Sequence, residues 1–170
     1  MTRALVIGRR RKGHRIGQVV SETGRRLEAA GWTVDEALVD GKKDLRRHAA
    51  RAVKAHVDVV VTVGGDGSVL QVVQELAETE VALGIVPMGT GNLLAGNLGI
   101  PHHLDRAVDV VVSGGRRRID LGRLTIGSEG EHEMFTVACG VGFDAEVMKA
   151  TGKRQKLRWG KLAYLASAIR

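Results

Sequence analysis

The chain has 170 residues, of which 44% are hydrophobic and 26% are charged, and its formal net charge is +7. These values are typical of a folded protein with an ordinary core, and they exclude intrinsic disorder. The single cysteine excludes an internal disulfide, and an aromatic content of only 3% argues against a protein that stacks the bases of single-stranded nucleic acid.

Residues 1–114 alternate between the patterns of strands and helices. Strands are predicted where apolar residues run together or alternate, at residues 4–7, 32–38, 57–63 and 82–86. Helices are predicted between them, from residue 16 up to Gly31, from about Leu45 to Val53, and from Ser68 to Glu78. The third strand is almost entirely β-branched, so we expect both of its faces to be buried. This alternation predicts a doubly wound α/β fold with a parallel sheet.

The pattern changes after Gly114. Two strand-like runs at residues 118–126 and 134–139 flank a glycine-containing segment and predict an antiparallel hairpin, and helical patterns follow at 144–150 and 159–169. We therefore expect residues 115–170 to begin a β-rich second domain. Because one hairpin is too little for an independent sandwich or barrel, we expect this domain to be incomplete in the chain.

Charge is spread unevenly along the sequence. Lys and Arg are in excess in the two outer thirds, for example in the run at residues 9–12, whereas residues 57–112 are acidic. A solvated surface is the ordinary interpretation of such runs, and contact with phosphate or an anionic membrane is the alternative. No signal-peptide pattern and no apolar stretch near the roughly 20 residues of a membrane span is evident. We expect a cytoplasmic protein, with peripheral contact at the inner face of the membrane as an alternative, and no nucleic-acid partner.

Two glycine-rich segments follow strands of the predicted sheet, Gly64-Gly65-Asp66-Gly67-Ser68 and Gly89-Thr90-Gly91-Asn92. The carboxyl ends of parallel strands meet at one edge, where such sheets bind ligands. Glycines let backbone N–H groups approach phosphate oxygens, and a helix N-terminus adds partial positive charge. A carboxylate fits beside phosphate if Mg²⁺ bridges the two or if it takes a proton from an attacking hydroxyl. The segments therefore predict phosphoryl transfer, with Asp66 as catalytic and metal-binding residue.

The polar residues of these segments also have structural interpretations. Asp66 could be a turn residue or a helix cap, and Ser68 with Gln71 matches a capping box. Thr90 and Asn92 could stabilise a turn before a short helix. Two such loops after two strands of one sheet are harder to explain in this way than either loop alone.

Together these segments resemble the diacylglycerol kinase catalytic domain family, which includes bacterial lipid kinases and sphingosine kinases. The segments that match are residues 61–68, 83–92, 119–122, 140–145 and 160–165. Gly-Gly-Asp-Gly alone is not specific, because NAD kinases and phosphofructokinases also carry it. The Pro-Met-Gly-Thr-Gly-Asn segment that begins at Pro87 is similar to the lipid-kinase branch.

The resemblance implies that ATP lies in the cleft of the α/β lobe and that a lipid acceptor lies against a C-terminal β-sandwich. The expected nucleotide-binding residues are Gly64, Gly65, Asp66, Gly67, Ser68, Val69, Leu70, Gly89, Thr90, Gly91 and Asn92. Asp66 would bind Mg²⁺ or accept a proton. Family members usually keep a catalytic Glu in the later β-sandwich, so we expect the catalytic base to lie beyond Arg170. The expected partners are a lipid substrate, an anionic membrane and a second copy of the chain.

The sequence departs from the family pattern in four places. Where family members have Asn-Pro after the first strand, this chain has neither residue near Gly8-Arg9. Where they have a Thr after the second strand, it has Val39 or Asp40. The Asn-Glu pair after the glycine loop is replaced by Leu70-Gln71, and the Thr of that loop is replaced by Ser68, which keeps the hydroxyl. These changes affect adenine and ribose contacts more than phosphate binding.

An ATP-dependent lipid kinase is therefore the expected function. Two alternatives stay open: a soluble-substrate kinase of the NAD kinase or phosphofructokinase kind, and a non-catalytic nucleotide-binding regulatory module.

Overall fold

The computed structural model describes residues 1–126 and 131–138. The chain divides into two compact units, residues 1–136 and 137–170, and the first unit carries every element named below. In chain order these are β1 (Arg3–Arg9), α1 (Ile16–Ala29), β2 (Thr33–Val39), α2 (Lys42–Lys54), β3 (Val59–Gly64), α3 (Asp66–Leu76), β4 (Ala82–Pro87), α4 (Leu93–Asn97), α5 (Leu104–Val112), β5 (Gly122–Ile126) and β6 (Glu131–Phe135).

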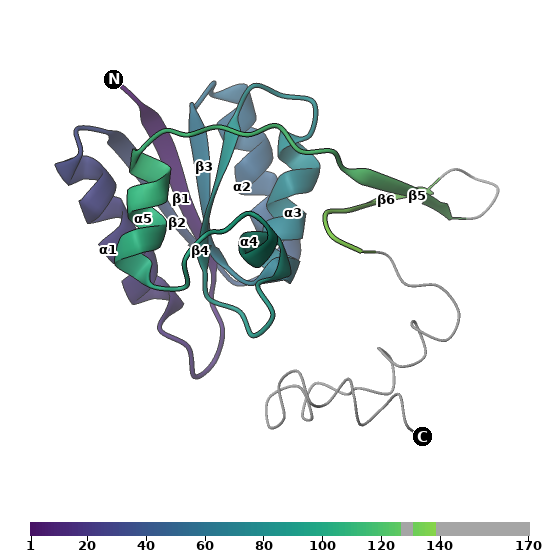
Figure 1. The fold of residues 1–170 in the computed structure, drawn as a ribbon, viewed down its shortest axis with the longest axis horizontal. Coiled ribbons are helices and arrows are strands. Elements are labelled where there is room, and N and C mark those ends of the chain that lie inside the picture. Colours follow the sequence, from purple (N-terminus) through teal and green to yellow (C-terminus); the bar gives the residue numbers. More distant parts are fainter. Residues whose placement is uncertain (127–130, 139–170) are drawn as a thin grey trace. The chain divides into compact units, whose positions relative to one another are not determined.

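Four parallel strands form the central sheet in the order β2-β1-β3-β4. The chain passes from β1 to β2 on one side and then returns to place β3 on the other side of β1, so the winding reverses between β1 and β3. Figure 1 shows α1 and α5 on one face of this sheet and α2 and α3 on the other. The predicted α/β fold with a parallel sheet is confirmed.

The core explains why β3 is so rich in β-branched residues. All six residues of β3 are buried. Because successive side chains of a strand point to opposite faces, Val61 and Val63 pack beneath α1 and α5, whereas Val60 packs with residues of α2 and α3. The predicted burial of this strand on both faces is confirmed.

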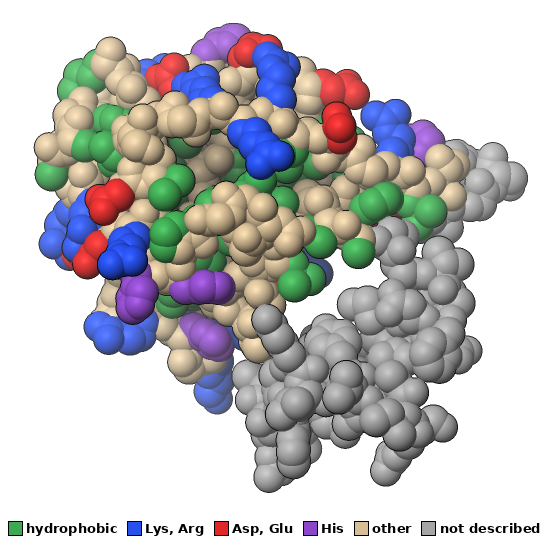
Figure 2. Space-filling model, viewed as in Figure 1, with side chains coloured by type: hydrophobic (Ala, Val, Ile, Leu, Met, Phe, Trp, Pro, Cys, Tyr) green, Lys and Arg blue, Asp and Glu red, His purple; other side chains and the backbone are tan. Residues whose placement is uncertain are grey.

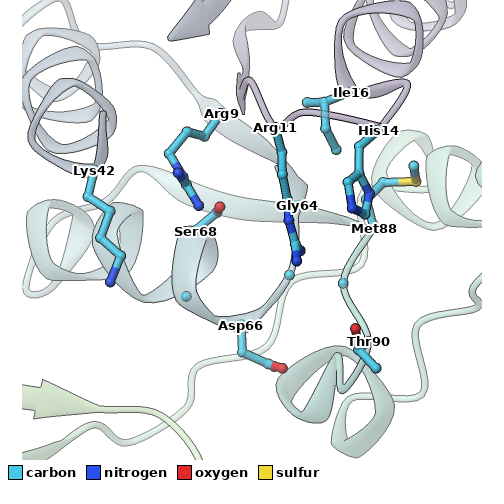
Figure 3. A pocket seen from close by; sticks show the side chains of 13 residues that line it. Arg9, Arg11, His14, Ile16, Lys42, Gly64, Asp66, Ser68, Met88 and Thr90 are labelled. Atoms are coloured by element: carbon cyan, nitrogen blue, oxygen red, sulfur yellow. The ribbon is translucent and has the colours of Figure 1, made fainter. Parts of the chain in front are cut away.

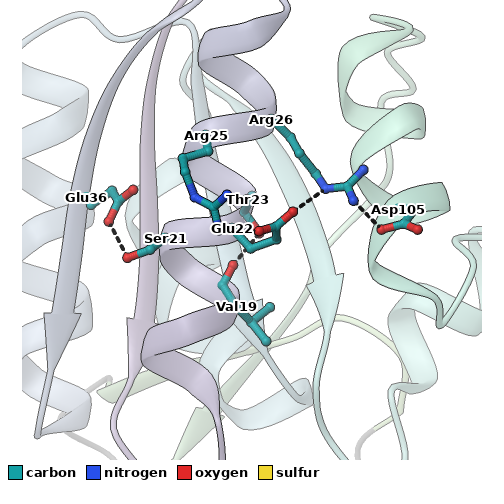
Figure 4. Close-up of polar contacts among 8 residues, drawn as sticks. All are labelled: Val19, Ser21, Glu22, Thr23, Arg25, Arg26, Glu36 and Asp105. Carbon is teal, nitrogen blue, oxygen red and sulfur yellow. Dashed lines mark hydrogen bonds and ion pairs between the residues drawn. The ribbon is translucent and has the colours of Figure 1, made fainter.

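Polar contacts join α1 to the elements beside it (Figure 4). The Nε of Arg26 donates to Glu22 Oε1 at 2.9 Å, and its Nη2 lies 2.7 Å from Asp105 Oδ1 on α5. The hydrogen bond to Glu22 raises the pKa of Arg26 above its ordinary value. On the other side, Ser21 Oγ donates to Glu36 Oε2 of β2 at 3.0 Å. Basic and acidic side chains are interspersed on the face of the molecule that Figure 2 shows. Solvent-exposed pairs of this kind add little net stability, so the apolar packing under α1 holds the helix in place.

The hairpin is present, with different strand limits from those predicted. β5 and β6 pair antiparallel from Gly122↔Phe135 to Ile126↔Glu131. The second strand, predicted at residues 134–139, lies earlier in the chain, at Glu131–Phe135, because its pairing begins at Glu131 opposite Ile126. The first strand is shorter than predicted, because it begins only at Gly122, which lies opposite Phe135, the last residue of its partner.

Some predictions lie outside the described residues or stay untested. The helical patterns at 144–150 and 159–169 lie outside the described residues. The domain boundary near residue 115 stays a prediction. In the described part of the chain, the structure contains no helix with both the length and the apolar character that crossing a membrane requires.

Candidate functional site

A pocket of about 240 Å³ lies at the carboxyl ends of β1, β3 and β4. It is located where the winding of the sheet reverses, which is where open α/β sheets bind ligands. Figure 3 shows its lining, which consists of Arg9, Arg11, His14, Ile16, Lys42, Gly64, Gly65, Asp66, Gly67, Ser68, Met88, Gly89 and Thr90. The structure therefore brings the two glycine-rich segments of the sequence to one site.

The two segments touch backbone to backbone. A Cβ atom added to Gly89 would lie 2.5 Å from the Cα of Gly65, and one added to Gly65 would lie 2.7 Å from the Cα of Gly89. Real Cβ atoms essentially never approach other atoms closer than 3.0 Å. Glycine is thus required at both positions by the close approach of the loops. We call the pocket-lining residues of the two segments, Gly64 to Ser68 with Gly89 and Thr90, the glycine floor.

The N-terminus of α3 forms part of the glycine floor. Gly65 is the N-cap with an extended backbone (φ −99°, ψ −177°), so the helix begins at Asp66, two residues before the predicted start at Ser68. The N–H groups of Asp66 and Gly67 are in its first turn, where the helix offers no acceptor. The N–H groups of Ser68 and Val69 both donate to the carbonyl of Gly65, at 2.8 and 3.1 Å.

The predicted capping box of Ser68 and Gln71 is wrong. Ser68 is the third helical residue, and no side chain hydrogen-bonds at the N-cap of α3. Its side chain lines the pocket instead, so its hydroxyl is available to a ligand (Figure 3).

Asn92 shapes the second loop rather than lining the pocket. Its backbone is left-handed (φ 48°), and its side chain is almost fully buried. The Oδ1 of Asn92 accepts from the Gly89 N–H at 2.8 Å, and its Nδ2 donates to the Gly89 carbonyl at 2.9 Å. These contacts agree with the turn interpretation of Asn92, because they fix the loop that ends at α4.

Asp66 joins the two segments through its side chain. Its Oδ1 accepts from the Leu94 N–H at 3.3 Å, across the pocket edge. A Cβ added to Gly91 would lie 3.0 Å from Oδ2, so Gly91 leaves the carboxylate room. Among the described pocket residues, Asp66 is the one acidic side chain.

The number of carboxylates in the pocket decides how Mg²⁺ could be bound there. The described part of the chain contains no group of three or more His, Cys, Asp or Glu residues that could hold a metal ion alone. Mg²⁺ is commonly held by one or two carboxylates together with the phosphates of a substrate. Asp66 therefore fits a metal that arrives with a phosphorylated ligand.

Four basic residues also line the pocket, namely Arg9, Arg11, His14 and Lys42. For the run at residues 9–12 the sequence leaves two interpretations open, a solvated surface and contact with phosphate or an anionic membrane, and it does not single out Lys42. The run itself was a visible signal, but its alignment with the pocket depends on how β1 pairs with its neighbours. Lys42 had no distinguishing signal, because it begins a helix that follows a different strand.

Four of the expected nucleotide-binding residues do not line the pocket. They are Val69, Leu70, Gly91 and Asn92. Val69 is buried in a cluster with Ile85 and Leu94, behind the glycine floor. A contact between these four residues and a nucleotide stays a prediction.

The fold is an α/β fold with a pocket at the reversal of its sheet. Residues 3–124 match the family model of the diacylglycerol kinase catalytic domain, and the chain belongs to this family.

Individual relatives agree with this assignment. The chain is 37% identical over 147 residues to a diacylglycerol kinase of Mycobacterium tuberculosis, covering 85% of the chain and 46% of that protein. It is 29% identical to the Escherichia coli protein named "Probable lipid kinase YegS", covering 84% of the chain and 48% of that protein. The chain spans less than half the length of these curated relatives.

A solved structure confirms the fold independently. The crystal structure of a diacylglycerol kinase from Bacillus anthracis str. Sterne superposes with a TM-score of 0.61 at 21% sequence identity. The match covers 71% of this chain and 44% of that one.

Proposed function

We propose that the protein is an ATP-dependent lipid kinase that binds the phosphate chain of ATP on the glycine floor and transfers the γ-phosphoryl group to a lipid hydroxyl. The observation that carries the proposal is the backbone contact between Gly65 and Gly89, which joins two loops and a helix N-terminus into one surface made largely of main chain. Membership in a family whose members are named kinases supports the reaction class. The names of the relatives support a lipid acceptor.

The described residues have distinct roles in this proposal. The N–H groups of Asp66 and Gly67 donate to phosphate oxygens, as helix N-termini do. The hydroxyls of Ser68 and Thr90 add donors at the two ends of the glycine floor. Leu94 fixes one oxygen of the Asp66 carboxylate, which leaves the other for a metal or a proton. Mg²⁺, when bound, neutralises charge that develops on the phosphates during transfer.

The proposal includes a location and partners. We place the protein in the cytoplasm, in peripheral contact with the inner face of the membrane, because its acceptor is a lipid and basic side chains are attracted to anionic lipid surfaces. A second copy of the chain is the proposed protein partner.

Two measurements test the proposal. Calorimetry should detect binding of MgATP to the folded protein. Because the catalytic base is expected beyond Arg170, the transfer assay uses a form of the protein that continues past Arg170, and incubation of that form with γ-labelled ATP, Mg²⁺ and extracted lipid should move the label into the organic phase. Transfer of the label to NAD or to a sugar phosphate, and not to lipid, would support the soluble-substrate kinase. Binding without transfer to any acceptor would support the regulatory module, and absence of binding to any nucleotide would refute all three.

A further inference from the structure

The extended backbone at the end of β1 determines which of the basic residues Arg9, Arg10 and Arg11 line the pocket. Arg9 is the last residue of β1, and the N–H of Arg10 still donates to the Val39 carbonyl at 2.7 Å, so the extended pairing with β2 continues past the strand. Successive side chains of an extended segment point to opposite sides. Arg9 and Arg11 accordingly line the pocket, whereas Arg10 does not.

Arg10, on one side of this extended segment, has an acidic partner, whereas Arg9 and Arg11, on the other side, have none among the described residues. The Nε of Arg10 lies 3.2 Å from Asp40 Oδ1, so its charge is paired at the surface. Within the described part of the chain, Arg9, Arg11 and Lys42 form no ion pair with a carboxylate. Figure 3 shows the guanidinium groups of Arg9 and Arg11 directed toward the Gly64–Ser68 segment. We call Arg9, Arg11 and Lys42 the basic wall.

The charge balance of the pocket indicates a ligand with several negative charges. The three basic side chains of the basic wall line the same pocket as the glycine floor, which has one carboxylate, Asp66. Guanidinium groups match phosphate oxygens with paired hydrogen bonds. The pocket volume of about 240 Å³ is smaller than the roughly 300–1,000 Å³ of sites that enclose a whole small-molecule ligand. A short chain of phosphates fits the charge and the volume of this pocket.

We infer that Arg9 and Arg11 clamp the phosphate chain of the phosphoryl donor against the glycine floor, so that the donor is recognised chiefly by its polyphosphate. This inference rests on the proposed function, since it assigns residues to the same pocket. It also explains how the pocket can bind phosphate where the sequence departs from the family after the first strand.

The test uses the full chain and three single variants, Arg9→Gln, Arg11→Gln and the control Arg10→Gln. Calorimetry measures the Kd for inorganic tripolyphosphate in EDTA and for MgATP. Loss of one charge-assisted contact should weaken tripolyphosphate binding about tenfold to hundredfold for Arg9→Gln and for Arg11→Gln. The control should stay within about twofold, because its charge faces Asp40. Circular dichroism verifies that each variant is folded.

Each outcome decides the inference. Equal losses in all three variants would overturn it, since they would indicate a general effect of net charge. Failure of the wild-type protein to bind tripolyphosphate would also overturn it. If the Arg9 and Arg11 variants lost affinity for phosphatidylglycerol vesicles and kept that for tripolyphosphate, the residues would serve the membrane and the inference would fail.

The inference and the proposed function can fail separately. Arginine-dependent binding of tripolyphosphate by a protein that transfers no phosphate to lipid would support the inference and refute the lipid kinase. Lipid phosphorylation by a protein whose Arg9 and Arg11 variants bind both ligands normally would refute the inference alone.

Discussion

Replacing Gly89 by alanine should force the two loops of the pocket apart. The new Cβ would lie 2.5 Å from the Cα of Gly65 and 2.7 Å from the Oδ1 of Asn92. Ordinary van der Waals contact begins at 3.4 Å, so relief of the first overlap requires a separation of about 0.9 Å. The atom in the way belongs to the backbone, which cannot rotate aside as a flexible side chain can.

This overlap should lower the free energy of unfolding of Gly89→Ala. Insertion of a methyl group into a closely packed region typically costs about 1–3 kcal/mol. Gly67→Ala is the matched control, because a Cβ at Gly67 meets nothing within 4 Å and the residue lies in the first turn of α3. Alanine in a helix is favoured over glycine by about 0.5–1 kcal/mol. The two substitutions should therefore change stability in opposite directions.

Urea unfolding followed by circular dichroism would measure both effects. With a slope of about 1–3 kcal/mol per molar urea, the midpoint of Gly89→Ala should fall by about 1 M, whereas that of Gly67→Ala should stay or rise. A Gly89→Ala variant as stable as the control would contradict the backbone contact between the two loops.

Three further substitutions test other parts of the site and core. Asp66→Asn removes the carboxylate charge, so it should abolish phosphoryl transfer in the labelled-lipid assay. Because the amide keeps an oxygen for the Leu94 N–H, the protein should stay folded and keep most of its calorimetric affinity for nucleotide. Asn92→Ala loses two hydrogen bonds to Gly89 and places alanine in a left-handed conformation, so urea unfolding should show a loss of about 1–3 kcal/mol. Leu45→Ala empties a fully buried position and should cost about 2–5 kcal/mol in the same measurement, and a loss below 1 kcal/mol would contradict the described packing.

The sheet and the glycine floor could be predicted because their signals are local. A β-branched run gives β3, and a glycine-rich segment directly after it gives a loop at the carboxyl edge. Two such segments after two parallel strands lie at that same edge, and they meet because β3 and β4 are neighbours in the sheet. The same local signals misplaced the start of α3, because the capping pattern at Ser68 competed with Gly65, whose extended backbone lets the helix begin earlier.

The basic wall could not be predicted, because it depends on contacts between distant parts of the chain. Which of the arginines at residues 9–11 faces the pocket is decided by the pairing of β1 with β2, which continues to Val39. Lys42 reaches the same pocket from the start of α2. The limits of β6 were missed for a related reason, since its polar residues form a strand only because β5 offers hydrogen-bond partners.

The backbone contact between Gly65 and Gly89 has a consequence for the entropy of binding. A surface made of main chain has no rotamers to immobilise when an anion arrives, so it is preorganised in a way that long side chains are not. Arg9 and Arg11, in contrast, each lose several freely rotating bonds on engaging a ligand. The conformational entropy lost on ligand binding is therefore concentrated on the arginine side of the pocket, while the main chain around Gly65 and Gly89 stays as rigid as the sheet that supports it.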